Sequence, residues 1–159
     1  MKNGGFGILG VAIGCVAGAV GMMLLKDKKI SEKKKKIDKF KNYYSMLNQW
    51  LTLKQENKSL LQYFEKNNYK DVAIYGMGEL GNRLFEELKN TNVNVVYAID
   101  KEAASVYSSI SIYEENDDLP EADVLVVTAT FAFEEIVEDL TQKIDIPIVS
   151  LEDVIYESF

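Results

Sequence analysis

The stretch VAIYGMGELGNRLFEEL, residues 72–88, decides the fold, because it predicts a buried strand, a glycine loop and a helix in direct succession. Val72–Tyr75 is a short apolar run typical of a buried strand. Glu79–Lys89 carries apolar residues at helical spacing. The junction has the GxGxxG pattern, with Gly76, Gly78 and Gly81. The stretch therefore predicts the first half of a βαβ unit.

The rest of the chain after residue 89 continues this alternation of apolar runs and helical patterns. Strands are predicted at Val93–Ile99, Ser109–Tyr113, Val124–Thr128 and Ile146–Val149, and helices at Phe131–Lys143 and Leu151–Tyr156. Such alternation predicts an α/β fold with right-handed crossovers. We expect a Rossmann-like parallel five-stranded sheet in the order 3-2-1-4-5, with N-terminal helices and one transmembrane helix.

The glycine loop is a candidate phosphate site, because a helix N-terminus presents free N–H groups and a partial positive charge. We expect Gly76 to make the tight turn, Gly78 to admit a phosphate beside Met77, and Gly81 to allow close packing. Asp100 ends the next strand, 19 residues after Gly81. That separation is typical of a carboxylate that accepts hydrogen bonds from a ribose.

Two hydroxyls after the fourth strand, Thr128 and Thr130, are candidate donors to a phosphate or a sugar, because strand ends line the crevice of such sheets. The alternative is that both hydroxyls are satisfied within their own turn. Glu79 lies in the first helical turn, where its charge opposes a phosphate. The alternative therefore remains that the fold is Rossmann-like but binds no ligand, with glycines that serve only packing.

The segment from Ile37 to Tyr69 has no Gly or Pro and predicts connecting helices. An apolar and aromatic stripe recurs there at helical spacing: Phe40, Tyr43, Tyr44, Leu47, Trp50 and Leu51. We expect this stripe to pack on its own domain, with an interaction surface as the alternative. Ser59 and Gln62 have the spacing of a capping box, which predicts a second helix from about residue 59.

Residues 4–25 contain no charge over 22 positions, long enough for a helix to cross a bilayer. The basic segment Lys26–Lys41 follows, with nine lysines and three acids. The positive-inside rule then places the N-terminus outside and the C-terminal domain in the cytoplasm, at the cell membrane. The lysines can rest on anionic lipid. A cleaved signal peptide and a lipoprotein signal at Cys15 are weaker alternatives.

Glycines four residues apart, Gly10, Gly14 and Gly18, predict close helix approach and a possible homo-oligomer. We divide the chain into a transmembrane anchor at 1–25, a basic juxtamembrane segment with connecting helices at 26–69, and a Rossmann-like domain at 70–159.

Composition limits the chemistry of the domain. From residue 42 onward the chain has eight Lys or Arg and 22 acids, a net charge of −14 that argues against nucleic acid as a partner. Histidine is absent and there is one cysteine, so any catalysis must use carboxylates, Lys, Tyr, Ser, Thr or a bound cofactor. No metal site and no catalytic residue is predicted. The acidic run Glu114–Asp118 is interpreted as a solvated loop.

Two resemblances follow from these motifs. Residues 4–25 with KDKKISEKKKK resemble the Gly-rich anchors of small bacterial envelope proteins of the YtxH type. Residues 43–157, with YGMGELG and LPEADVLVVTAT, resemble Rossmann-like domains attached to bacterial sugar acyltransferases and capsule or exopolysaccharide glycosyltransferases. The resemblance implies an accessory role, a nucleotide-sugar ligand at the glycine loop and Asp100, and a glycosyltransferase partner. The catalytic modules of those proteins have no counterpart here.

Three hypotheses follow. The first is a membrane-anchored module that binds a nucleotide or nucleotide-sugar. The second is a scaffold without a ligand, which contacts a partner enzyme through residues 37–66. The third is a small oxidoreductase or epimerase that uses NAD(P). It is less favoured, because the second βαβ half that would bind the rest of a dinucleotide is missing. We lean against an enzyme.

Overall fold

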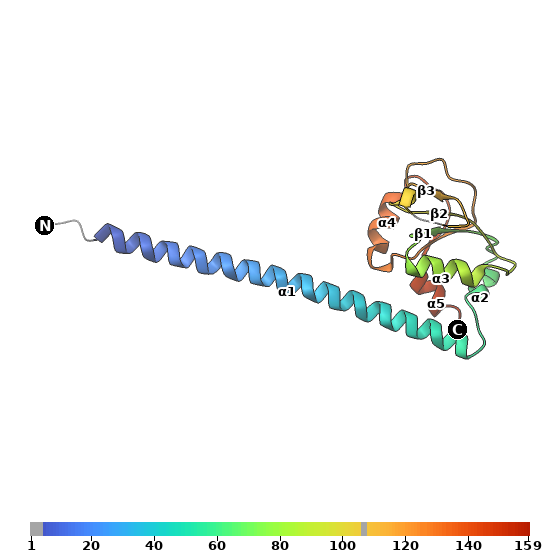
Figure 1. Cartoon of the computed structure of the whole chain (residues 1–159), viewed down its shortest axis with the longest axis horizontal. Coiled ribbons are helices and arrows are strands. Elements are labelled where there is room, and N and C mark those ends of the chain that lie inside the picture. Colours follow the sequence, from blue (N-terminus) through green and yellow to red (C-terminus); the bar gives the residue numbers. More distant parts are fainter. Residues whose placement is uncertain (1–4, 106–107) are drawn as a thin grey trace. The chain divides into compact units, whose positions relative to one another are not determined.

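The structure of the chain, a computed structural model, describes residues 5–105 and 108–159, without the side chains of 5–25, Asp27 and Ser105. The helices and strands in chain order are α1 (Gly5–Gln55), α2 (Leu61–Lys66), β1 (Asp71–Tyr75), α3 (Glu79–Leu88), β2 (Asn94–Ile99), the 3-10 turn η1 (Ala103–Ser105), β3 (Ile112–Tyr113), β4 (Val124–Val127), the 3-10 turn η2 (Thr130–Ala132), α4 (Phe133–Leu140), β5 (Ile148–Ser150) and α5 (Leu151–Tyr156) (Figure 1). The chain divides into two compact units, Met1–Tyr44 and Ser45–Phe159.

The second unit is built on one five-stranded sheet with the order β3-β2-β1-β4-β5. All four strand pairs are parallel. The predicted α/β class and strand order are therefore confirmed. The buried residues of β1 and β4 are nearly all apolar, as expected for central strands that are covered on both faces.

Helices α3 and α4 cover opposite faces of this sheet. Ala73 and Tyr75 of β1 share a buried cluster with Ile136 and Leu140 of α4. Ile74, which points to the other face, lies below the first turn of α3. Right-handed crossovers in opposite directions require this arrangement. The point where the strand order reverses is therefore between β1 and β4, where this fold class binds ligands.

Several element ends differ from the predicted ones. The third strand is confined to Ile112–Tyr113, the fourth helix to Phe133–Leu140, and the fifth strand to Ile148–Ser150. The fifth strand begins just after Pro147, whose carbonyl accepts a 2.9 Å bond from Leu125 N. Proline has no N–H to give to a sheet, which explains why this strand starts later than its apolar pattern suggests.

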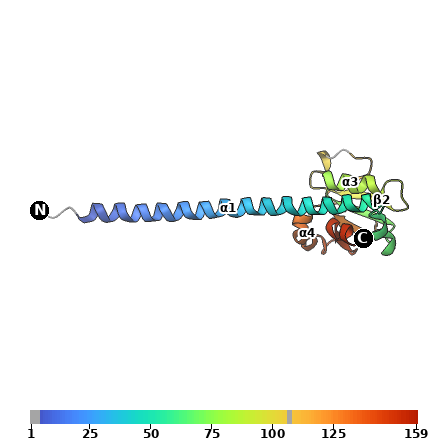
Figure 2. The same ribbon diagram turned by 90° about the horizontal axis from the view of Figure 1, so that it is seen from below.

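Helix α1 is continuous from Gly5 to Gln55 (Figure 2). Within the second unit, Met46, Trp50 and Leu53 are buried. Four other side chains of the predicted stripe are exposed, namely Phe40, Tyr44, Leu47 and Leu51, and Tyr43 is half-buried. Within the second unit, packing of the stripe on its own domain is therefore confirmed for Trp50 and wrong for Leu47 and Leu51, because a helix buries only the side that faces its neighbours.

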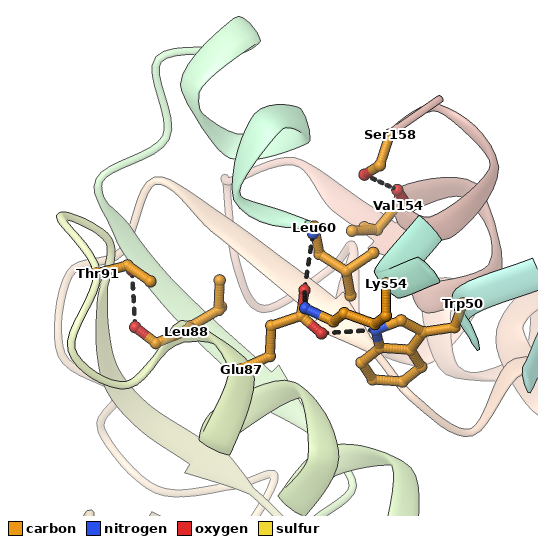
Figure 3. Close-up of polar contacts among 8 residues, drawn as sticks. All are labelled: Trp50, Lys54, Leu60, Glu87, Leu88, Thr91, Val154 and Ser158. Carbon is orange, nitrogen blue, oxygen red and sulfur yellow. Dashed lines mark hydrogen bonds and ion pairs between the residues drawn. The ribbon is translucent and has the colours of Figure 1, made fainter. Parts of the chain in front are cut away.

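The predicted capping box at Ser59 is wrong. Helix α2 begins at Leu61, and its N-cap residue, Leu60, makes no side-chain cap bond. The Leu60 N–H instead donates a 2.8 Å bond to Glu87 Oε1 of α3. Figure 3 shows this carboxylate between Leu60 and the end of α1. A distant carboxylate thus replaces the local cap.

Asparagines follow the ends of the first three helices. Asn57, Asn68 and Asn90 all have a positive φ, between 58° and 68°. Asparagine tolerates this left-handed conformation better than most residues, so it terminates helices.

The structure does not describe the side chains of the predicted transmembrane span, residues 4–25, which includes Gly10, Gly14 and Gly18. Among the described residues, none of the helices is long and apolar enough to cross a membrane. The side chains of the basic segment from Lys28 to Asp38 are all exposed.

Candidate functional site

The glycine loop follows β1 at the carboxyl edge of the sheet. Gly76 has a φ of +92°, which side-chain-bearing residues rarely adopt. Its N–H donates a 2.8 Å bond to the carbonyl of Ile99 at the end of β2. The predicted tight turn at Gly76 is therefore confirmed.

Gly81 lies in the first turn of α3 and packs against this loop. A Cβ added at Gly81 would meet the carbonyl oxygen of Gly76 at 2.1 Å, far inside van der Waals contact. The same Cβ would lie 3.5 Å from Cγ2 of Ile74. The role of Gly81 in close packing of helix and strand is therefore confirmed.

Gly78 differs from the other two glycines. It is the N-cap of α3, with φ −69° and ψ −160°, a conformation open to any residue. A Cβ added at Gly78 would meet nothing within 4 Å. Neither strain nor crowding within the chain explains a glycine here.

Asp100 follows β2 and reaches the glycine loop. Its Oδ2 accepts a 2.8 Å bond from Met77 N, and its Oδ1 accepts a 2.9 Å bond from Glu102 N. The predicted carboxylate and the predicted loop are thus brought together. Each carboxylate oxygen has a second lone pair, so Asp100 retains the capacity to accept bonds from a hydroxyl.

Thr128 supports the loop from below. Its hydroxyl lies 3.1 Å from the carbonyl oxygen of Tyr75 and 2.7 Å from that of Gly76. The residue is only 5% exposed. A hydroxyl has one proton, and here that proton is directed to loop carbonyls. This geometry matches the alternative of a turn hydroxyl satisfied within the protein.

Thr130 lies elsewhere, at the start of η2. It lines a cavity of about 430 Å³ at the carboxyl ends of β4 and β5, together with Ser150, Glu134 and Asp153. Thr128 therefore contacts the glycine loop, whereas Thr130 lines a separate cavity. The acids from the first turns of α4 and α5 make this cavity unfavourable for anions.

Glu115 is a polar residue near the site that the sequence interpretation missed. It accepts a hydrogen bond from the hydroxyl of Tyr75, the last residue of β1, and its carboxylate lies 3.6 Å from Lys101 Nζ. Burial, followed by this bond to Glu115, raises the pKa of Tyr75. The interpretation of the run Glu114–Asp118 as a solvated loop is therefore wrong for Glu115. The run itself gives no sign of this contact, because Tyr75 lies 40 residues away in the sequence.

A cavity of about 680 Å³ is lined by no residue of the glycine loop. It includes Asp71, the first residue of β1, and Asp123, which precedes β4, so it opens at the amino edge of these strands. Acidic side chains outnumber cations in its lining, where Lys143 is the counter-charge. Within residues 5–105 and 108–159, His, Cys, Asp and Glu form no group that is suited to a metal ion.

Comparison of the chain with family models, with curated proteins and with solved structures yields no match. The resemblance to Rossmann-like domains of polysaccharide enzymes therefore stays a prediction from the motifs themselves.

Proposed function

We propose that the chain is a membrane-anchored module whose glycine loop binds a nucleotide or nucleotide-sugar at the inner face of the membrane. Following the resemblance, its role is accessory to cell-surface polysaccharide synthesis, beside a glycosyltransferase. The proposal concerns binding and assigns no catalytic step.

The observation that carries this proposal is the open space above Gly78. The φ of Gly76 and the crowding at Gly81 explain two glycines from within the chain. Gly78 has neither reason, and Ser, Asp or Asn would cap α3 better. A glycine there leaves the start of the helix accessible, as close approach of a phosphate to the backbone requires.

The charges around the loop favour a particular class of ligand. Asp100 and Glu79 place two carboxylates at or beside the loop, and both disfavour a phosphate with two negative charges. A diphosphate that links a nucleoside to a sugar has one charge per phosphate and no terminal dianion. Its ribose hydroxyls can use the second lone pairs of Asp100. These features support a nucleotide-sugar over a nucleoside triphosphate.

The anchor is proposed from the sequence of residues 4–25 and the lysines that follow it. By the positive-inside rule, the second unit then lies on the cytoplasmic side. The exposure of the lysines from Lys28 to Lys36 leaves them available to anionic headgroups. A reporter fused to the C-terminus that is active only outside the cell would contradict this orientation.

A thermal-shift experiment on residues 38–159 tests the binding. UDP-sugars, nucleoside di- and triphosphates, CoA and NAD(P) are compared at matched ionic strength. A ligand at 100 times its Kd stabilises by about 2.7 kcal/mol, which raises Tm by several degrees. We expect the shift with a UDP-sugar and its loss in Gly78→Val. Glu86→Val, at an exposed position near the other end of α3, is the matched control and keeps the shift.

The substitution Asp100→Asn separates the two halves of the ligand. It removes the charge and keeps one acceptor oxygen. We expect weaker binding of uridine, because the ribose loses its carboxylate, and tighter binding of inorganic pyrophosphate, because the repulsion is gone. Equal losses for both probes would contradict the orientation proposed here.

A scaffold without a ligand is the second candidate. Its support is that the loop is already held by the protein, through Asp100 to Met77 and through Thr128 to Gly76. The absence of a shift with every compound, at concentrations up to the millimolar range, would favour this function over the first.

A further inference from the structure

Helix α1 carries an exposed apolar stripe in the first unit, separate from the glycine loop. We define the α1 stripe as Ile30, Ile37, Phe40 and Tyr44. Phe40 is 71% exposed and Tyr44 is 74% exposed, and both isoleucines are 54% exposed. Large side chains with such exposure are common singly but not as a regular row, so the row calls for an explanation.

The spacing of the stripe is that of a coiled coil. Its residues are separated by seven, three and four positions, so that Ile30, Ile37 and Tyr44 occupy heptad position a and Phe40 occupies position d. In the second unit the same register continues along the sequence through Leu47 and Leu51, which are also exposed. Position d at residue 33 is the polar Lys33, which interrupts the apolar row once.

The charges beside the stripe are of one sign. The flanking e and g positions between residues 29 and 41 are all lysine: Lys34 and Lys41 at e, and Lys29 and Lys36 at g. The outer positions b, c and f over residues 31–42 include two lysines and two acids, Glu32 and Asp38, and are neutral in sum. Positive charge is thus concentrated along the two edges of the stripe.

This pattern argues against a second copy of the chain as the occupant. In a parallel pair, g positions meet e positions, and in an antiparallel pair like positions meet. Either arrangement brings lysine against lysine along this stripe, which is repulsive. A partner helix with Glu or Asp at its e and g positions would meet the lysines with opposite charge. Repulsion against self and attraction to an acidic partner together specify a heterotypic pair.

We propose that the α1 stripe is the docking face for an acidic amphipathic helix of another protein, with apolar residues at a and d and carboxylates at e and g. The inference is independent of nucleotide binding at the glycine loop. The anchored chain would recruit such an acidic partner through α1.

The test uses the full chain in zwitterionic detergent micelles and two synthetic peptides of about four heptads. Both peptides have Ile at a and Leu at d. One has Glu at e and g, and the other has Lys there. Anisotropy of a labelled peptide measures the affinity. We expect the Glu peptide to bind at least about tenfold more tightly than the Lys peptide, with a difference that shrinks as salt increases.

Two pairs of variants identify the surface. Phe40→Ser with Tyr44→Ser should lower the affinity for the Glu peptide at least about tenfold. Lys35→Ser with Asn42→Ser, at the outer f positions, should change this affinity less than about twofold. Lys34→Glu with Lys41→Glu should remove the preference for the Glu peptide, because two glutamates at e then balance the two lysines, Lys29 and Lys36, that remain at g. Lys28→Glu with Lys35→Glu makes the same change in charge at f positions and should leave the preference intact.

Three outcomes would overturn the proposal. The first is equal binding of the two peptides, or binding of the Glu peptide that ignores Phe40→Ser with Tyr44→Ser. The second is self-association of the full chain in sedimentation that this double variant removes, because the stripe would then pair with itself. The third is binding of the fragment 26–159 to phosphatidylserine vesicles, lost in the same variant, without binding to the Glu peptide.

Discussion

Trp50 Nε1 donates a 2.6 Å hydrogen bond to Glu87 Oε2, and this bond ties the end of α1 to α3. The other carboxylate oxygen, Oε1, accepts from Leu60 N at 2.8 Å and lies 2.5 Å from Lys54 Nζ. The Glu87 side chain is only 7% exposed. One carboxylate thus joins three helices in the second unit (Figure 3).

Replacing Glu87 with Ala should therefore lower the free energy of unfolding by about 2–4 kcal/mol, because two N–H donors lose a charged acceptor. Urea unfolding of residues 38–159, followed by fluorescence, measures the effect. Trp50 is the one tryptophan in the chain, so the signal reports on this joint. Glu86→Ala is the control, since Glu86 pairs with Lys89 at the surface and should cost less than about 0.5 kcal/mol. Equal costs for the two variants would contradict the role of Glu87.

Gly81 and Gly78 should respond differently to alanine. In Gly81→Ala the new Cβ would meet the Gly76 carbonyl oxygen at 2.1 Å, so loop and helix must separate. We expect a loss of about 2 kcal/mol or more in the free energy of unfolding. Gly78→Ala has no such contact and should change stability by less than about 1 kcal/mol. A large loss at Gly78 would mean that its glycine is structural, which removes the main support for a ligand.

The Thr128 hydroxyl should contribute to stability and not to ligand affinity. Thr128→Val keeps the shape and removes the bonds to the carbonyls of Tyr75 and Gly76. We expect a cost of about 1–2 kcal/mol in unfolding, because buried carbonyls lose a donor. Thr130→Val, at a partly exposed position, is the comparison and should cost less. If Thr128→Val instead weakened the binding of a UDP-sugar and left the free energy of unfolding unchanged, the Thr128 hydroxyl would be a ligand contact.

Alkaline pH should destabilise the second unit through Tyr63. Burial, with a smaller contribution from the charge of Glu157, raises the pKa of Tyr63 from 10.0 to about 12. The folded state keeps the proton while the unfolded state loses it above pH 10. The contribution is therefore complete below pH 10 and is lost as pH rises from 10 towards 12, by up to about 1.4 kcal/mol per pH unit.

The variant Tyr63→Phe should make this alkaline decline less steep, because the ring stays in the core and one titrating group is gone, while Tyr75, whose pKa is also raised, still contributes. Unfolding in urea at several pH values between 9 and 12 measures the slope. Tyr44→Phe, which alters an exposed tyrosine, should leave the slope as it is. An unchanged slope in Tyr63→Phe would assign the decline to other tyrosines.

The sheet could be predicted from sequence because its information is local. Apolar runs such as Val124–Val127 mark strands, and right-handed crossovers leave few possible strand orders. The glycine loop was recognisable for the same reason, since the spacing of Gly76 and Gly81 reflects a turn and a close contact within six residues. Asp100 could be placed near the loop because neighbouring parallel strands end at one edge.

The sequence patterns did not predict contacts between residues that are far apart along the chain. Ser59 has the pattern of a cap, yet Glu87 supplies the acceptor at this helix start from 27 residues away. The run containing Glu115 looked solvated, yet Glu115 binds Tyr75. Helical spacing predicts one surface for the apolar stripe on α1, although Trp50 is buried and Leu51 is exposed. Pattern along the chain does not say which neighbour a side chain meets.

The sequence by itself determined the parallel α/β sheet, its order and the glycine loop, because periodicity, crossover handedness and turn chemistry act over short distances. Only the tertiary structure decided which glycine is free of internal constraint, which is Gly78, and which side of α1 stays exposed. Both depend on how tightly other segments pack around a residue, and that packing is set by the whole chain.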